Sequence, residues 1–381
     1  MSMPASEGGG GGGLGPGSGS GPGSGPGGVP SAIAITPILS ARYRPADLER
    51  IREAAPGSRI VAVSLEGLAD APLDDVEVLL RGPLPAAVFE RLLTRCPRLR
   101  WVHSATAGVE RVLIPAALER GLAISNARGV FSRPIAEYVM LMILSVSRRL
   151  PQLLELQRER TWQPLESREL RDVTIGIVGL GSIGGAVAAL ATAFGCRVIA
   201  TRREVGALEA SAGASSAGAG APAGVSVRAA DDDELPAIEP IIDRIMPPEA
   251  LPELLAESDF VVLALPLTAD TEDLIDDHAL AAMKPGAWLI NVARGRLVDE
   301  RALLRALAAG RIGGAVLDAF REEPLPPESP FYDLDNVIVT PHTSWSSGRV
   351  LDRSIELFCE NLRRFRAGEP LRNRVDPRVG Y

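Results

Sequence analysis

The 381-residue sequence has few cysteines, few histidines, no basic cluster and no long apolar run. Its three cysteines, Cys96, Cys196 and Cys359, are odd in number and far apart. We therefore expect no disulfide framework and no metal site, and a reducing, cytoplasmic compartment. No apolar segment reaches the roughly 18 residues of a membrane span, and the N-terminus lacks the basic and apolar regions of a signal peptide. The net charge of −8 argues against nucleic acid as a partner.

The residues that are present indicate two α/β domains and two low-complexity segments. Hydrophobic residues make up 46% of the chain and charged residues 23%, and the length exceeds that of one ordinary domain. Residues 1–30 are rich in glycine, proline and serine, so we predict a disordered tail there. Residues 204–240 contain a second tract of this kind, which we interpret as an insertion.

Apolar runs of strand length alternate with helix-like segments through the rest of the chain. Repeated β-α-β units predict a doubly wound parallel sheet with helices on both faces, in the α/β class. We expect strands at 33–35, 60–63, 76–80, 124–125, 173–178, 197–200, 260–265, 288–292, 314–317 and 337–340. We expect helices at 85–94, 115–120, 135–148, 185–194, 248–257 and 299–309.

A glycine-rich turn, GLGSIG, follows the predicted strand at 173–178 and precedes a small-residue helix. It matches the dinucleotide-binding pattern G-x-G-x-x-G at Gly179, Gly181 and Gly184. In that pattern the first glycine allows a tight turn, the second lets backbone approach a pyrophosphate, and the third lets the helix pack on the strand. The context between a strand and a helix favours dinucleotide binding over a glycine-rich turn without a ligand.

The next strand ends in Arg202 and Arg203, where NAD-binding proteins usually place a carboxylate for the ribose 2′-hydroxyl. A guanidinium suits a 2′-phosphate through its charge and its planar set of donors. The pair therefore favours NADP over NAD as the cofactor. The alternative is that both arginines are merely solvated at the end of a strand.

The three histidines differ in their sequence surroundings. His278 lies in a polar segment at a predicted helix start and is expected to be exposed. His103 precedes a small-residue loop and could line a pocket. His342 directly follows a predicted strand, where the active sites of α/β proteins usually lie, and is the best candidate for an acid–base group.

Four segments resemble the D-isomer-specific 2-hydroxyacid dehydrogenase family of NAD(P)-dependent enzymes: 173–184, 265–268, 283–303 and 314–342. Residues 101–110 and 125–140 are similar more loosely. The resemblance implies a Rossmann-type domain at 132–328, inserted into a flavodoxin-like substrate domain made of 31–131 and 329–381. It also implies helices near 134–149 and 346–367 that cross between the domains, and a homodimer built on the cofactor domains.

The same resemblance assigns catalytic roles to Arg294 in the family's N-x-x-R-G, to Glu323 before a proline and to His342 in T-P-H. Their chemistry suits the reduction of a 2-keto acid. Histidine can donate a proton to the carbonyl oxygen, and a paired carboxylate favours its imidazolium form. Arginine can hold the substrate carboxylate and polarise the keto oxygen.

The remaining expected site residues also follow from the resemblance. Ala107 and Gly108 belong to a loop whose backbone N–H groups bind the substrate carboxylate, although Glu110 stands where the family often has aspartate. The expected cofactor contacts, besides the three motif glycines and the two arginines, are Ser182, Ile183, Pro266, Val292, Ala293 and Asp318.

The implied reaction is reversible hydride transfer between NAD(P) and a small D-2-hydroxy acid or 2-keto acid, with glyoxylate or hydroxypyruvate reduction as the first hypothesis. A phosphoglycerate dehydrogenase-like enzyme is one alternative. A non-enzymatic, dinucleotide-sensing protein like the dehydrogenase-shaped corepressors is another. Formate dehydrogenases are disfavoured, because that branch has glutamine where Glu323 stands.

Overall fold

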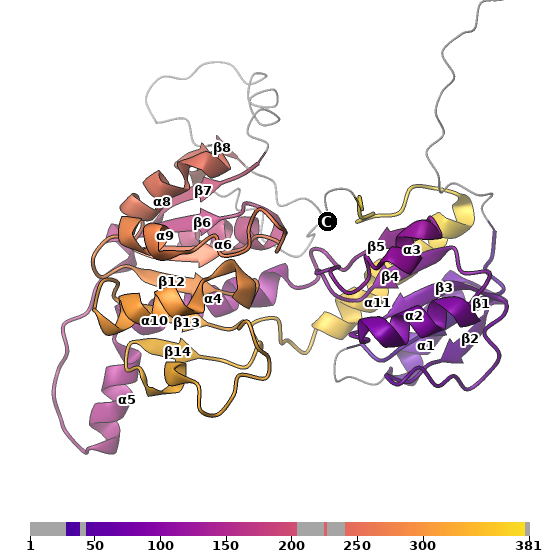
Figure 1. The fold of residues 1–381 in the computed structure, drawn as a ribbon, viewed down its shortest axis with the longest axis horizontal. Coiled ribbons are helices and arrows are strands. Elements are labelled where there is room, and N and C mark those ends of the chain that lie inside the picture. Colours follow the sequence, from indigo (N-terminus) through magenta and orange to yellow (C-terminus); the bar gives the residue numbers. More distant parts are fainter. Residues whose placement is uncertain (1–27, 39–42, 204–224, 227–240, 378–381) are drawn as a thin grey trace, which may run out of the picture.

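The computed structural model describes residues 28–38, 43–203, 225–226 and 241–377. Within these ranges the chain forms two units side by side, each built on a parallel sheet (Figure 1). The expected tail at 1–30 and the expected insertion at 204–240 lie largely outside the described residues.

The smaller unit contains a five-stranded sheet in the order β2-β1-β3-β4-β5, with every pair parallel. This is the strand order of flavodoxin-like folds. The strands are β1 (Ala32–Ile35), β2 (Arg59–Ala62), β3 (Val76–Arg81), β4 (Trp101–Ser104) and β5 (Ala123–Ser125). On one face lie α2 (Ala86–Arg95) and α3 (Pro115–Glu119), and on the other α1 (Pro45–Ala54) and α11 (Val350–Ala367).

The larger unit contains a seven-stranded parallel sheet in the order β10-β7-β6-β11-β12-β13-β14. Its first six strands have the Rossmann order, so the predicted α/β fold is confirmed. The strands are β6 (Thr174–Val178), β7 (Arg197–Thr201), β10 (Arg244–Met246), β11 (Phe260–Leu263), β12 (Trp288–Asn291), β13 (Gly314–Leu317) and β14 (Val337–Val339).

Helices cover both faces of the larger sheet because its strands alternate their side chains between two apolar clusters. Ile177 faces the cluster under α4 (Ser132–Ser147) and α6 (Ser182–Ala193), whereas Val178 faces the opposite one. That second cluster packs under α8 (Leu251–Glu257), α9 (Asp277–Ala282) and α10 (Glu300–Ala308). The larger unit also contains a small antiparallel pair, β8 (Val225–Ser226) with β9 (Ile241–Ile242). Short 3-10 turns lie at Leu170–Asp172, Pro248–Ala250, Gly295–Leu297 and Pro330–Asp333.

The chain leaves the larger unit later than residue 328, the boundary expected from the sequence. β14 pairs in parallel with β13, and Val337 and Val339 pack against the larger sheet's core. This strand therefore belongs to the larger unit, and the chain returns to the smaller one along α11. Near its start Val350 joins the core of the larger unit, while Phe358 and Leu362 join the core of the smaller.

Helix α5 (Leu150–Arg158) was not expected from the sequence and projects from the larger unit (Figure 1). None of its nine residues is buried, and Leu150, Leu153 and Leu154 are exposed. Trp162, four residues beyond its end, is fully exposed. An amphipathic helix without a covered face gains little stability from this chain alone.

The three cysteines lie in three different apolar clusters, and all are free and buried. Cys196 is in the larger unit, Cys96 follows α2 in the smaller unit, and Cys359 lies on α11. Burial raises the pKa of each thiol to about 11. Among the described residues, no helix has the length and apolarity that crossing a membrane requires.

Candidate functional site

The glycine-rich turn after β6 has the geometry that its motif requires. Gly179 has a φ of 97°, and a Cβ placed there would lie 2.7 Å from the Cβ of Leu265. A Cβ on Gly184 would lie 2.2 Å from the carbonyl oxygen of Gly179, so only glycine lets α6 pack this closely. Gly181 differs, because a Cβ on it would meet no described atom within 4 Å. The open side of Gly181 leaves room for a ligand against the backbone.

The amino end of α6 fits the pyrophosphate of a dinucleotide. Ser182 and Ile183 begin this 12-residue helix, whose first N–H groups have no partner inside the helix. In the described first turn there is no acidic residue, and Gly181 forms no side-chain cap. The helix dipole and free N–H groups therefore favour an anion at this point.

The two arginines expected to read the adenosine end follow β7 directly. Arg202 is half-buried, and its backbone N–H donates to the carbonyl oxygen of Met246 in the neighbouring strand β10, 2.9 Å away. Arg203 is exposed. Because strand β7 is adjacent to β6, both residues lie at the same sheet edge as the glycine-rich turn.

His342 and Glu323 form a close pair in the loops that follow β14 and β13. Nδ1 of His342 lies 3.0 Å from both carboxylate oxygens of Glu323. The two side chains are 37% and 40% exposed, so a ligand can reach the imidazole. Burial raises the pKa of Glu323, but hydrogen bonds from His342 and the Phe320 N–H, with the charges of His342 and Arg294, hold it below its ordinary value.

Arg294 follows β12 and has an unexpected partner in the smaller unit. Its carbonyl oxygen accepts a hydrogen bond from Asn291 Nδ2 (2.9 Å), and its Nη1 donates to the carbonyl oxygen of Ala293 (2.8 Å). Its Nε donates to Glu110 Oε1 at 3.1 Å. The positive charge of Arg294 is one of the causes that hold the pKa of Glu323 below its ordinary value.

Asp318 follows β13 and holds the loop that carries His342. Its fully buried carboxylate accepts hydrogen bonds from the Thr340 hydroxyl (2.6 Å) and the N–H groups of Thr343 (2.8 Å) and Ser344 (2.9 Å). His342 lies between these anchors with a left-handed φ of 49°, which few non-glycine residues adopt. Asp318, expected as a cofactor contact, thus fixes the backbone on both sides of His342.

Tyr138 extends this network and was missed from the sequence. Its hydroxyl, on α4, lies 2.6 Å from Thr340 Oγ1, which in turn bonds Asp318. Burial raises the pKa of Tyr138 to about 12, so the phenol remains protonated and can donate. No local motif marks Tyr138, since it lies 202 residues from Thr340 in the chain.

The loop after β4 presents free donors beside Arg294. The carbonyl oxygen of Ala107 accepts from Asn126 Nδ2, and that of Gly108 accepts from the Thr106 hydroxyl, each at 2.8 Å. The N–H groups of Ala107 and Gly108 form no hydrogen bond with any described residue. Such donors next to a guanidinium can bind a carboxylate.

The other expected positions lie at the same sheet edge or have a different role. Pro266 follows β11 and is exposed, while Val292 and Ala293 follow β12 and are buried. His278 is exposed on α9, as expected. His103 does not line a pocket, since it is fully buried in β4, where burial lowers its pKa to about 3.

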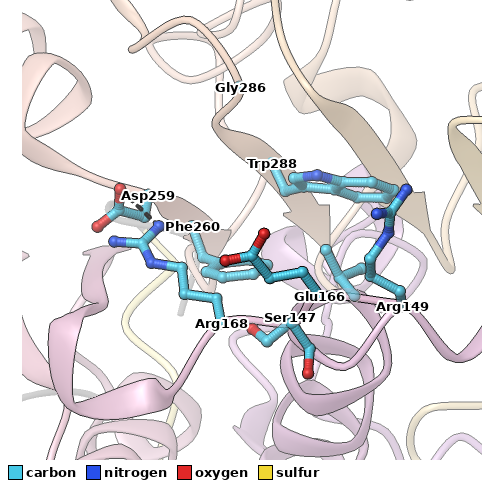
Figure 2. Close-up of a pocket in the computed structure, with 10 residues that line it drawn as sticks. Ser147, Arg149, Glu166, Arg168, Asp259, Phe260, Gly286 and Trp288 are labelled. Atoms are coloured by element: carbon cyan, nitrogen blue, oxygen red, sulfur yellow. Dashed lines mark ion pairs between the residues drawn. The ribbon is translucent and has the colours of Figure 1, made fainter. Parts of the chain in front are cut away.

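A cavity of about 550 Å³ lies at the opposite, amino end of the larger sheet, where Phe260 and Trp288 begin β11 and β12 (Figure 2). Arg168 and Asp259 form an ion pair of 3.1 Å at its edge. Ligands of doubly wound sheets bind outside the carboxyl ends of the strands. The cavity is therefore separate from the candidate site.

The sequence matches the family described as D-isomer specific 2-hydroxyacid dehydrogenase, NAD binding domain, over residues 140–218 and 211–344. The chain belongs to the D-isomer specific 2-hydroxyacid dehydrogenase family. The chain is 32% identical over 339 residues to a glyoxylate reductase of Korarchaeum cryptofilum, covering 87% of this chain and 90% of the relative. It is 35% identical over 284 residues to a D-3-phosphoglycerate dehydrogenase of Mycobacterium tuberculosis, covering 74% of this chain but only 48% of that relative.

Solved structures agree with the family assignment. A D-isomer specific 2-hydroxyacid dehydrogenase from Xanthobacter autotrophicus Py2, in complex with NADPH and MES, has a TM-score of 0.74 and 29% identity, covering 92% of this chain and 99% of that one. An NADPH-dependent glyoxylate/hydroxypyruvate reductase from Sinorhizobium meliloti, in complex with NADP and sulfate, has a TM-score of 0.72 and 26% identity, covering 92% and 100%. The protein is therefore an NAD(P)-dependent oxidoreductase that acts on CH–OH groups.

Proposed function

We propose that the protein reduces small 2-keto acids, with glyoxylate or hydroxypyruvate as the substrate, to D-2-hydroxy acids. The observation that carries this proposal is the His342–Glu323 pair, in which both carboxylate oxygens lie 3.0 Å from Nδ1. Arg294, whose charge acts on Glu323, follows β12, the strand that neighbours β13. Relatives named glyoxylate reductase and the neighbour named glyoxylate/hydroxypyruvate reductase support this choice of substrate.

The chain's own residues can perform each step other than the hydride transfer, which a bound nicotinamide cofactor supplies. Arg294 and the free N–H groups of Ala107 and Gly108 bind the substrate carboxylate. Glu323 occupies Nδ1 of His342, so Nε2 is left to face the keto oxygen. The imidazolium donates its proton there as the carbonyl is reduced, and accepts it in the reverse reaction.

The experiment is a panel of 2-keto acids assayed with NADPH and NADH by absorbance of the reduced cofactor. We expect the highest kcat/KM with glyoxylate or hydroxypyruvate. Saturable NADPH binding without turnover of any 2-keto acid would contradict the proposal and favour a dinucleotide-sensing protein. A clear preference for a phosphorylated keto acid would favour a phosphoglycerate dehydrogenase-like enzyme.

We also propose NADP as the preferred cofactor, with Arg202 and Arg203 at the 2′-phosphate. Their position after β7, one strand from the glycine-rich turn, supports this, as do the neighbours solved with NADPH and NADP. Loss of a charge-assisted contact costs roughly 1.5–3 kcal/mol, or about 10- to 150-fold in affinity. Arg202→Asp should erase the preference for NADPH, and a wild-type enzyme that prefers NADH would overturn the idea.

A homodimer built through α5 completes the proposal. Leu150, Leu153, Leu154 and Trp162 are exposed together on a projecting segment, which is the kind of apolar surface that an interface covers. Light scattering should give twice the chain mass, and Leu153→Glu with Trp162→Ser should give the monomer. The exposed Tyr332, mutated to serine, is the matched control. A monomeric wild type would contradict this part.

The three free, buried cysteines support a reducing, cytoplasmic compartment.

A further inference from the structure

One ion pair joins the two units at the site, and its carboxylate has no part in the chemistry proposed above. Nε of Arg294, from the larger unit, lies 3.1 Å from Oε1 of Glu110, from the loop after β4 in the smaller unit. Arg294 is the group proposed to hold the substrate carboxylate. The protein therefore keeps a carboxylate of its own beside that guanidinium.

The pair lies directly over the backbone that is proposed to bind substrate. A Cβ placed on Gly108 would lie 1.9 Å from Arg294 Nη2 and 2.5 Å from Glu110 Oε2. The N–H of Gly108 forms no hydrogen bond with any described residue. A carboxylate bound to this N–H and to Arg294 would therefore lie within a few ångströms of Glu110.

The charges at the site leave little attraction for a second anion. Glu110 and Glu323 are carboxylates, Arg294 is a guanidinium and His342 is an imidazole. These four groups have a net charge of zero when the imidazole is protonated and of −1 when it is neutral. Glu110 and Arg294 are 41% and 35% exposed, so their field is moderated by solvent but still reaches a bound ligand.

We infer that Glu110 is a specificity-determining residue, which admits 2-keto acids with one negative charge and disfavours those with a second carboxylate or a phosphate. The inference rests on the proposed function, because it assumes that Arg294 and Gly108 bind the keto acid. It narrows the substrate class to monoanions, with an uncharged or positive substituent beyond the carbonyl carbon.

The experiment compares Glu110→Gln, which keeps the shape and removes the charge, with Glu110→Asp, which keeps the charge. The ratio of kcat/KM for oxaloacetate, a dianion, to that for hydroxypyruvate, a monoanion, should rise roughly tenfold in Glu110→Gln, the order expected for a like charge a few ångströms away. It should stay within about twofold of wild type in Glu110→Asp. A ratio unchanged in Glu110→Gln, or raised equally in both variants, would overturn the inference.

A binding measurement keeps this result separate from the proposed function. Oxamate and oxalate resemble each other in size but have one and two negative charges. Their dissociation constants are measured by calorimetry on the NADP-loaded protein. Relative to oxamate, oxalate should bind roughly tenfold tighter to Glu110→Gln than to wild type. If wild type turns over no keto acid, the proposed function fails, but the ratio of the two dissociation constants still tests Glu110. Equal ratios in wild type and Glu110→Gln would overturn the role of Glu110 in specificity.

Discussion

The seven-stranded sheet contributes charged side chains to the site, whereas the five-stranded sheet contributes a loop with free backbone donors and one carboxylate. The contrast is sharpest between two histidines. His342, in the loop after β14, is 37% exposed and paired with Glu323. His103, inside β4, is fully buried, with Nδ1 2.8 Å from the Ser125 hydroxyl and no partner for Nε2 among the described residues. Two residues of one type thus have opposite surroundings: a ligand can reach His342, whereas His103 belongs to the core.

The largest expected effect comes from removing the exposed histidine. His342→Ala should lower kcat by roughly 10²–10⁴-fold, the usual contribution of general acid–base catalysis. Cofactor affinity should change little, because the glycine-rich turn and α6 lie in a different part of the sheet edge. Steady-state kinetics with hydroxypyruvate and NADPH titration measure the two effects. His278→Ala, on the exposed start of α9, is the control. Near-normal turnover by His342→Ala would show that the proton comes from another group.

A smaller effect is expected from neutralising the partner of His342. The pKa of Glu323 is held below its ordinary value, so its carboxylate stays charged until the pH falls below the usual range of glutamate. At neutral pH this charge acts on the ring of His342. Glu323→Gln removes the charge that stabilises the imidazolium, so reductive kcat/KM should fall about tenfold near neutrality, and the loss should shrink at pH values low enough to protonate Glu323 in wild type. Glu322→Gln, next to it and exposed, should keep the wild-type profile.

The network behind His342 should have a further, smaller effect. Thr340→Val keeps the shape of the side chain but removes the hydroxyl that joins Tyr138 to Asp318. We expect kcat to fall about fivefold to tenfold, which corresponds to about 1–1.4 kcal/mol, the net contribution of an ordinary hydrogen bond, while KM for the keto acid stays similar. Thr340→Ser should restore kcat. Equal losses in both variants would mean that packing of the methyl group matters and the hydroxyl does not.

The buried histidine should affect stability and its pH dependence. The pKa of His103 is about 3 in the folded protein and near 6.5 when unfolded, so the unfolded chain binds the extra proton between these values. Stability should therefore decrease as the pH falls from about 6.5 to 3, with a contribution of at most about 1.4 kcal/mol per pH unit from this residue. His103→Gln should reduce that slope in urea unfolding curves. His278→Gln should leave it unchanged, and an unchanged slope in both would contradict the assignment.

The fold and much of the site could be predicted where local chemistry restricts the sequence. Gly179 and Gly184 are required by a positive φ and by a 2.2 Å approach, so their spacing is informative on its own. The cofactor-domain strands are apolar on both faces and therefore stand out as continuous runs. The position of His342 after a strand makes it an acid–base candidate without any motif. Arg294 and Glu323 are candidates only through the family motifs, since an isolated arginine or glutamate has no distinctive pattern.

The features that were missed depend on partners far away in the chain. Tyr138 meets Thr340 across 202 residues, and Glu110 meets Arg294 across 184. Strand β10 has only three residues and follows the low-complexity tract, so no periodicity could reveal it. The leucines at 150, 153 and 154 have helical spacing, but helix α5 has only nine residues, includes Pro151 near its start and buries none of them, so the pattern is too short to be distinctive.

The reactivity of the three buried thiols can report local opening of the native protein. Each lies in a different apolar cluster, and each is kept in the unreactive thiol form by burial, with a pKa of about 11. An alkylating reagent can therefore label a cysteine only after the surrounding element has opened. The labelling rates of Cys96, Cys196 and Cys359, separated by peptide mass, would report how readily each unit and the helix that joins them open in the native protein, without any substitution.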